Sequence, residues 1–176
     1  MVSGDDHHAH PQKPGRGLPD IIHRKRDETM SELLNDEYFM RQALREAQQA
    51  AEEGEVPVGA VIVCDGRIIA RAHNQTERLN DVTAHAEILA ITAAELVLGA
   101  KYLTNCTLYV TVEPCVMCAG AIGWAQVSKI AYGAPDAKRG YSLYAPKAFH
   151  PKATVIKGLL EEECASLMSG FFKSRR

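Results

Sequence analysis

The sequence predicts an α/β fold, arranged as a three-layer α-β-α sandwich around a central five-stranded mixed sheet. Two observations support this class. Segments whose apolar residues recur at helical spacing alternate with short strands that are rich in β-branched residues. An Asp-Gly pair between two of these strands is typical of a tight hairpin turn.

The regular pattern begins at Asp36. From there apolar residues recur at helical spacing as far as Ala50, and Gly54 is expected to end the helix. The Asp65-Gly66 pair joins the first two strands, and residues 133–151 are expected to form a long loop. Strands are predicted over residues 58–63, 67–72, 107–112, 129–132 and 154–156.

Three further helices complete the alternation. Residues 84–98 form the first, with Thr83 as its N-cap and Gly99 at its end. Residues 115–124 form a short apolar helix. Residues 161–173 form the last helix, which is acidic at its start and basic at its end, as the helix dipole favours.

Composition is that of a soluble globular protein, with 46% hydrophobic and 24% charged residues. No apolar stretch approaches the roughly 18 residues that would suggest a membrane span. The N-terminus also lacks the apolar segment of a secretory signal. We therefore expect a cytoplasmic protein with no membrane partner.

Residues 1–29 differ from the rest of the chain. They are rich in His, Pro, Gly and charged residues and show no apolar period, which is typical of a disordered tail. His7, His8 and His10 also fit a tag remnant, or an arm that binds metal or RNA. We expect an N-terminal extension over residues 1–29 and one folded domain over residues 30–176.

The net charge and the cysteine count limit which partners and which cellular compartment are expected. The formal net charge is −2, so an RNA partner would have to be held by a local basic patch. The five cysteines are an odd number, which argues against a secreted disulfide framework. In a reducing compartment the close pair Cys115 and Cys118 is better interpreted as metal-binding or redox-active.

A metal site is predicted where two helices begin. Cys115 and Cys118 stand three residues apart at a helix N-terminus, which places both sulfurs on one face. The positive end of that helix favours thiolates, the form that binds metal. If His85, at the start of the preceding helix, lies beside them, the three residues form a zinc site whose fourth position is open for catalysis.

Glu87 follows His85 by two residues, near the metal but not as a ligand. A carboxylate there can take a proton from a zinc-bound water, whose pKa zinc lowers to about 7, and pass it to a substrate. We therefore predict that Glu87 is the catalytic acid and base.

Each motif alone has a simpler interpretation. A lone C-x-x-C is as often a redox pair or half of a structural zinc site, for which Cys106 or His73 could supply the fourth ligand. Asn74 could be a plain turn residue, and the segment from Asp136 to Lys138 a solvated loop. The combination of H-x-E, about thirty intervening residues and P-C-x-x-C, with each motif after a predicted strand, favours catalytic zinc.

The combined pattern resembles the zinc deaminase superfamily, whose signature is H-x-E followed by P-C-x-x-C. Within that superfamily, longer segments resemble the tRNA adenosine deaminases. These segments are Glu55–Val61, Ala72–Asn74, Glu113–Ile122, Tyr132–Gly140 and Glu163–Lys173. The resemblance extends from about Asp36 to Arg176.

The resemblance implies a cytidine deaminase-like fold and a hydrolytic reaction, in which a zinc-activated water converts adenosine to inosine at the wobble position of tRNA. It implies one zinc per subunit, held by His85, Cys115 and Cys118, with Glu87 moving protons. The implied partners are a tRNA anticodon loop and a second copy of the chain, since the family is typically homodimeric.

The resemblance also implies substrate contacts. Asn74 would hydrogen-bond the extruded nucleoside, the N–H groups of Ala86 and Cys115 would lie near the base, and Asp136 would lie by a neighbouring anticodon nucleotide. Lys138 belongs to a set of basic residues that could bind phosphates. The other members of this set are Arg139, Lys147, Lys152, Lys173, Arg175 and Arg176.

Two departures from the family pattern concern RNA recognition. Pro135 stands where the family often has Arg, and the stretch from Tyr141 to Lys152 is shorter. The alternative enzyme is a deaminase of a free base or nucleotide, of guanine, cytidine or deoxycytidylate type. The non-enzyme alternative is an RNA-binding subunit with a structural zinc, which could dispense with the carboxylate that Glu87 supplies.

Overall fold

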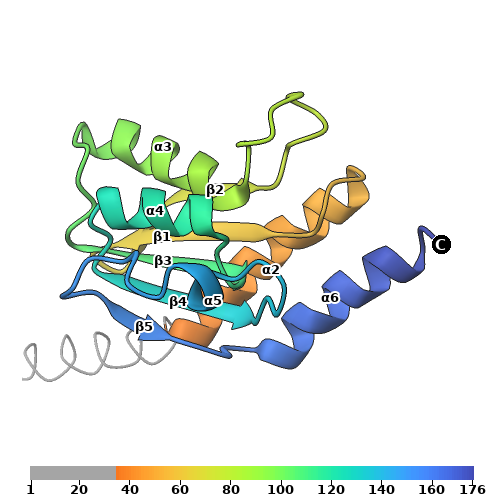
Figure 1. Cartoon of the computed structure of the whole chain (residues 1–176). Helices are drawn as coiled ribbons and strands as arrows, with labels where there is room; N and C mark the ends of the chain where they lie inside the picture. Colours follow the sequence, from red (N-terminus) through yellow and green to blue (C-terminus); the bar gives the residue numbers. More distant parts are fainter. Residues whose placement is uncertain (1–34) are drawn as a thin grey trace, which may run out of the picture. The chain divides into compact units, whose positions relative to one another are not determined.

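The structure is a computed structural model that describes residues 35–176. Its five-stranded sheet has the strand order β2-β1-β3-β4-β5 (Figure 1). β1 is antiparallel to β2 and β3, whereas β3, β4 and β5 are parallel. The strands are β1 Gly59–Cys64, β2 Arg67–His73, β3 Cys106–Val112, β4 Lys129–Ala134 and β5 Thr154–Ile156.

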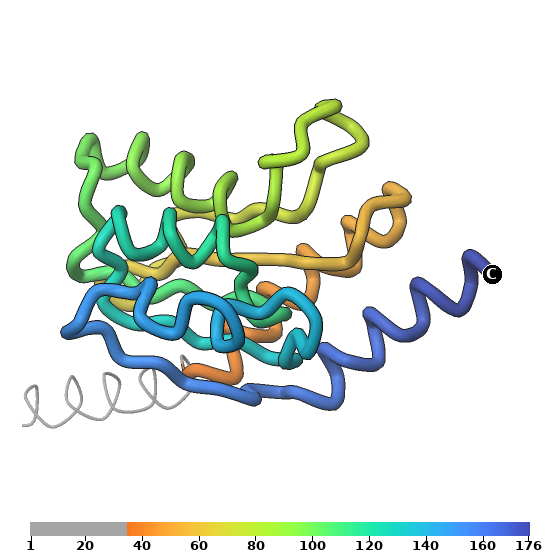
Figure 2. Tube along the Cα trace, in the orientation of Figure 1, coloured from red at the N-terminus to blue at the C-terminus, as the bar shows by residue number. Residues whose placement is uncertain are grey.

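Helices cover both faces of the sheet, which confirms the predicted sandwich (Figure 1 and Figure 2). They are α2 Asp36–Glu52, α3 Ala86–Leu98, α4 Val116–Trp124, the short α5 Tyr141–Tyr144 and α6 Glu161–Lys173. Strand side chains alternate between the faces. Ile62 and Leu108 belong to the core beneath α3 and α4, and their neighbours Val61 and Tyr109 to the core beneath α2 and α6. Two apolar cores therefore hold the three layers together.

The predicted start of α3 is wrong by two residues. The Thr83 hydroxyl donates a hydrogen bond to Asp81 Oδ1 at 2.7 Å instead of capping the helix. His85 takes the N-cap position with an extended backbone. The predicted end is confirmed, because Gly99 closes the helix in the left-handed conformation with φ of 61°.

The long loop predicted over residues 133–151 is also only partly a loop. β4 continues to Ala134, and Tyr141–Tyr144 form α5. The ring of Tyr141 is buried between those of Tyr132 and Phe149, with centroids 6.2 and 4.3 Å away. Burial of this aromatic residue folds the segment back over the sheet beside α4.

Gly59 allows β1 to start directly against α2. A Cβ atom built on Gly59 would collide with the carbonyl oxygen of Ala43 and the amide nitrogen of Ala47. The Gly59 N–H donates to Thr111 Oγ1 at 3.1 Å, which fixes the strand from its other side. This close approach accounts for the glycine that follows Val56-Pro57-Val58 in the sequence.

Two expectations from the sequence concern the N-terminal segment and membrane-spanning helices. The proposed tail over residues 1–29 and the domain start at residue 30 lie outside the described residues. Over residues 35–176, no helix combines the length and the apolar character needed to cross a membrane.

The substitution Gly59→Ala should lower the free energy of unfolding by about 2–3 kcal/mol, because the new methyl group overlaps backbone atoms of α2 that cannot move separately. Gly170→Ala is the matched control. Gly170 lies inside α6 with no atom within 4 Å of a built Cβ, so alanine should stabilise by up to about 1 kcal/mol. Urea unfolding measures both changes, and equal effects of the two substitutions would contradict the packing argument.

Candidate functional site

The donor atoms of His85, Cys115 and Cys118 lie together at the N-termini of α3 and α4. His85 Nδ1 is 3.4 Å from Cys118 Sγ and 3.7 Å from Cys115 Sγ, and all three donors lie within 4.8 Å of one another. Zinc bonds of about 2.0 Å to nitrogen and about 2.3 Å to sulfur, at a tetrahedral angle, separate N and S by about 3.5 Å. The measured distances bracket that value, so this donor set fits a zinc ion with one position open.

The local backbone explains why these side chains converge. His85 and Cys115 are the N-caps of α3 and α4, both have extended backbones, and neither side chain makes a capping hydrogen bond. Hydrogen bonds from Cys118 and from His85, in that order, lower the pKa of the Cys115 thiol to about 4. The thiolate at this position is further favoured by the positive end of α4.

A structural zinc site with a fourth protein ligand does not form here. Cys106 begins β3 and Cys115 follows the end of that strand, so a seven-residue strand of about 23 Å separates them. His73 is occupied, because its ring nitrogens contact Glu46 Oε2 at 3.3 Å and Glu53 Oε2 at 2.9 Å. Within residues 35–176, only His85, Cys115 and Cys118 form a cluster with metal-ligand spacing.

Glu87 lies in the first turn of α3, with 3% of its surface exposed. Burial raises the pKa of this carboxyl group to about 7, whereas the positive charge of a bound zinc ion would lower it again. A buried carboxyl group beside the metal donors, and outside their set, has the position that a proton shuttle requires.

A pocket of about 670 Å³ opens beside this cluster. Its wall includes the predicted residues Asn74, His85, Ala86, Glu87, Cys115, Asp136 and Lys138. Cys118 lies behind them, fully buried. The size is within the range of small-ligand sites, and Ala86 contributes the first N–H of α3, which has no carbonyl partner within the helix. The structure thus brings the eight predicted site residues to one place.

Asn74 is held in one wall of the pocket by a buried carboxylate. Asn74 Nδ2 lies 3.4 Å from both Glu55 Oε2 and Thr76 Oγ1. Glu55 also accepts the backbone N–H groups of Glu77, at 3.2 Å, and Arg78, at 2.8 Å. Because these contacts use the Asn74 amide nitrogen, its carbonyl oxygen is the atom left to accept a hydrogen bond from a substrate.

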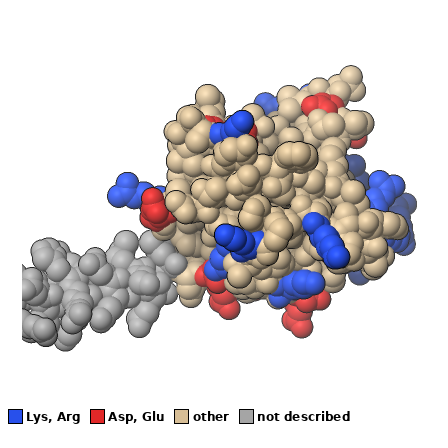
Figure 3. Space-filling model, turned by 60° about the vertical axis from the view of Figure 1, so that its left-hand side comes forward, with Lys and Arg blue, Asp and Glu red and all other residues tan. Residues whose placement is uncertain are grey.

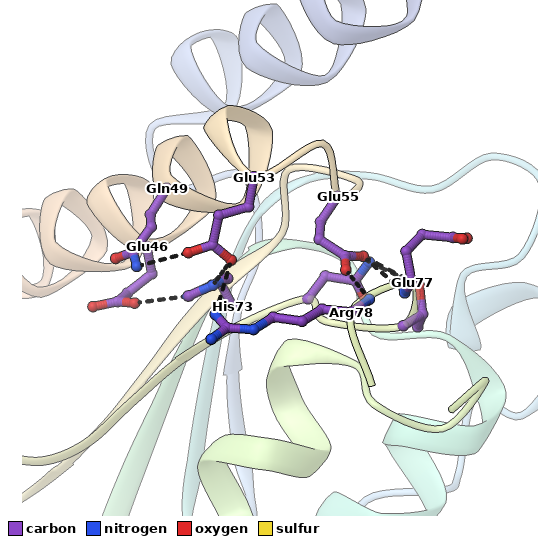
Figure 4. A network of polar contacts seen from close by, with 9 residues as sticks. Glu46, Gln49, Glu53, Glu55, His73, Glu77 and Arg78 are labelled. Carbon is purple, nitrogen blue, oxygen red and sulfur yellow. Dashed lines mark hydrogen bonds and ion pairs between the residues drawn. The ribbon is translucent and has the colours of Figure 1, made fainter. Parts of the chain in front are cut away.

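A polar network supports this wall from behind (Figure 4). His73 precedes Asn74 and joins Glu46 and Glu53 of the α2 end. Glu53 in turn lies 3.7 Å from the guanidinium of Arg78. His73 is therefore not a fourth metal ligand but connects α2 with the segment that carries Asn74.

The opposite wall is formed by the segment from Pro135 to Arg139. Asp136 Oδ1 accepts the backbone N–H groups of Lys138 at 2.9 Å and Arg139 at 3.0 Å, which folds the segment into a tight turn. The buried Glu113 accepts the N–H of Asp136 at 2.9 Å. The Asp136 side chain therefore shapes the wall on which the basic residues stand.

α6 supplies pocket residues that the sequence does not identify. They are Ala165, Met168, Ser169 and Phe172. Their spacing of three and four residues marks one helix face, but a sequence pattern cannot distinguish a face that lines a pocket from one that packs in the core. The sequence also gives no sign that Glu55 and Glu113 anchor the pocket walls. Both lie in segments that resemble the family, but their roles depend on contacts made only in the folded chain.

The predicted basic patch is only partly assembled. Lys138 and Arg139 line the pocket. Arg175 instead donates to the carbonyl of Gly54 and lies over the ring of Phe171, 4.2 Å from its centroid. In the face shown by Figure 3, Lys and Arg stand mostly apart among uncharged atoms, and some lie beside acidic residues. This face therefore carries no broad area of one charge.

Comparison with known proteins gives a consistent result. The family model described as the cytidine and deoxycytidylate deaminase zinc-binding region matches residues 33–134. The tRNA-specific adenosine deaminase of Bacillus subtilis (strain 168) is 47% identical over 149 residues, which cover 82% of this chain and 92% of that protein.

Two solved structures extend the comparison. One, from studies of A-to-I editing by tRNA:A34 deaminases, has a TM-score of 0.69 and 48% identity, covering 74% of this chain and 98% of that chain. The guanine deaminase of Bacillus subtilis has a TM-score of 0.56 and 42% identity, covering 66% of this chain and 71% of that chain. Sequence identity, coverage and the zinc-fitting cluster agree, and the chain belongs to the tRNA-specific adenosine deaminase family of zinc-dependent deaminases.

Proposed function

We propose that the protein deaminates adenosine to inosine at the wobble position of tRNA. The observation that carries this proposal is the pocket beside the His85, Cys115 and Cys118 cluster, which Glu87, Lys138 and Arg139 help to line. The near full-length similarity to the Bacillus subtilis enzyme supports tRNA as the substrate.

In the proposed mechanism, His85, Cys115 and Cys118 hold one zinc ion. A bound zinc ion would act as a Lewis acid and make water a nucleophile near neutral pH. Glu87 takes one proton from the attacking water and passes it to the ring nitrogen beside carbon 6 of adenine. It then takes the remaining proton of the hydroxyl group added to carbon 6 and gives it to the departing amino group, as the bond from carbon 6 to that nitrogen breaks. The products are inosine and ammonia.

The walls of the pocket hold the extruded nucleoside. Asn74 offers its carbonyl oxygen, and the free N–H groups at the start of α3, beginning with Ala86, lie close to where the base enters. Asp136, Lys138 and Arg139 face the flanking nucleotides and their phosphates. Adenosine in an anticodon loop suits such a pocket, because extruding a base from a loop costs less than extruding it from a duplex.

A free-base deaminase is the competing function, and the similarity to guanine deaminase gives it a specific basis. Purified full-length protein should form inosine in a tRNA anticodon stem-loop and release no ammonia from guanine, cytidine or deoxycytidylate. Chromatography of nuclease-digested RNA and an ammonia assay give the two readouts. Turnover of a free compound without inosine in RNA would overturn the tRNA assignment.

Glu87→Gln should reduce kcat about 10²–10⁴-fold and leave zinc bound, because the amide preserves shape but carries no proton between atoms. Glu95→Gln, two turns further along α3 and outside the pocket, should keep full activity. Zinc is measured by atomic absorption on the samples used for kinetics. Normal turnover by zinc-loaded Glu87→Gln protein would exclude the proposed role.

We also infer a homodimer that forms around α4 and α5. Trp124, Leu143 and Tyr144 are 84%, 55% and 67% exposed, which is unusual for large apolar side chains. We further propose the reducing cytoplasm as the compartment, because Cys115 and Cys118 can hold zinc only in their reduced form.

Trp124→Glu should shift the protein from dimer to monomer, because burial of the new carboxylate in an apolar contact is unfavourable. Sedimentation velocity at micromolar concentration measures the shift. Leu96→Glu, on the exposed far end of α3, is the control and should leave the mass unchanged. A monomeric wild-type protein would contradict the homodimer.

A further inference from the structure

We propose that Glu113 is a positioning residue that fastens the segment 135–140 to the zinc-ligand loop, so that recognition of the nucleotide next to the target adenosine depends on it. This inference rests on the proposed function and goes beyond it. The proposed mechanism assigns no role to Glu113, which lies outside the donor set of His85, Cys115 and Cys118.

The first argument is the bonding of the Glu113 carboxylate. Glu113 is 5% exposed, and within residues 35–176 it has no Lys, Arg or His partner. Its two oxygens instead accept one backbone N–H each, from Asp136 at 2.9 Å and from Ser142 at 3.1 Å. A buried carboxylate is costly unless it is hydrogen-bonded, so these bonds fix both ends of the segment between Asp136 and Ser142.

The second argument is the backbone beside this carboxylate. Pro114 accepts the N–H of Tyr141 at 2.9 Å, and Cys115 forms an isolated antiparallel bridge with Gly140. The metal-ligand loop and the pocket wall are therefore joined along residues 113–115. The contacts of Pro114 and Cys115 are made by backbone atoms, so a change of the Glu113 side chain leaves them, and the zinc ligand Cys115, in place.

Gly140 shows how tightly the carboxylate fits. A Cβ built on Gly140 would lie 2.5 Å from Glu113 Cδ and Oε1, and 2.6 Å from the Asp136 carbonyl oxygen. The φ of Gly140 is −58°, which any residue can adopt, so the glycine is needed for space and not for its backbone conformation. The wall can reach Glu113 only because this position lacks a side chain.

The anchored wall presents Lys138 and Arg139 to the pocket. Their backbone N–H groups are held by Asp136, whose own N–H is held by Glu113. Loss of one Glu113 bond should therefore displace the surface that faces the neighbouring nucleotide. The wall that carries Asn74, anchored by Glu55, should stay in place.

The test compares two RNA substrates with full-length, zinc-loaded protein. One is an anticodon stem-loop, and the other is the same RNA with abasic sites on both sides of the target adenosine. Wild-type protein should prefer the intact RNA. Glu113→Gln keeps the size of the side chain but has one acceptor where two are needed, so kcat/KM for the intact RNA should fall about tenfold while the abasic RNA is little affected.

Two further variants make the result specific. Gly140→Ala should lower the preference for the intact RNA in the same way, and it tests the proposal independently if Glu113→Gln fails to fold. Glu55→Gln removes the other buried carboxylate anchor, and it should slow both RNAs equally because it acts through Asn74.

Three outcomes would overturn the proposal: equal loss on both RNAs for Glu113→Gln and Gly140→Ala, loss that follows zinc content, or the same change of preference in Glu55→Gln. Absence of inosine formation by wild-type protein would instead refute the proposed function.

Discussion

The meeting of two helix N-termini on one face of the sheet is the constraint on which the site depends. α3 and α4 each begin with a residue in extended conformation, and those residues are His85 and Cys115. Because neither side chain is used to cap its own helix, both point into the space between the helices. Cys118 and Glu87 follow within one turn, so all four side chains come from the N-caps and first turns of two helices.

Around that point the protein uses carboxylates as anchors for irregular backbone. Glu55 and Glu113 are both buried, and each accepts N–H groups from a pocket wall that belongs to no strand. Loops of this kind would otherwise leave buried donors without partners. A carboxylate can satisfy two or more donors at once, which an uncharged side chain of similar size does less well. The two walls are therefore held in place without regular secondary structure, so their shape is not limited to that of a helix or a strand.

The sequence was sufficient wherever a local pattern determines local geometry. The spacing of Cys115 and Cys118 and the position of Glu87 after His85 predicted side chains that the structure brings together. The alternation of strands with helices predicted the layers. The sequence was insufficient where long-range contacts decide. Thr83 bonds Asp81 and leaves the cap to His85, and Tyr141 turns part of a loop into α5 by packing on Tyr132. Long-range contacts also decide the role of the α6 residues in the pocket. Only the folded chain shows which face of α6 lines the pocket beside the starts of α3 and α4.

The position of α6 in the chain determines when the pocket wall can be completed during synthesis. Its residues Met168 and Phe172 complete the pocket wall, and Arg175 binds the carbonyl of Gly54, next to the anchor Glu55. All the proposed metal ligands and Glu87 precede α6 in the chain. During synthesis, the proposed zinc ligands and Glu87 therefore leave the ribosome before the residues of α6 that complete the pocket wall.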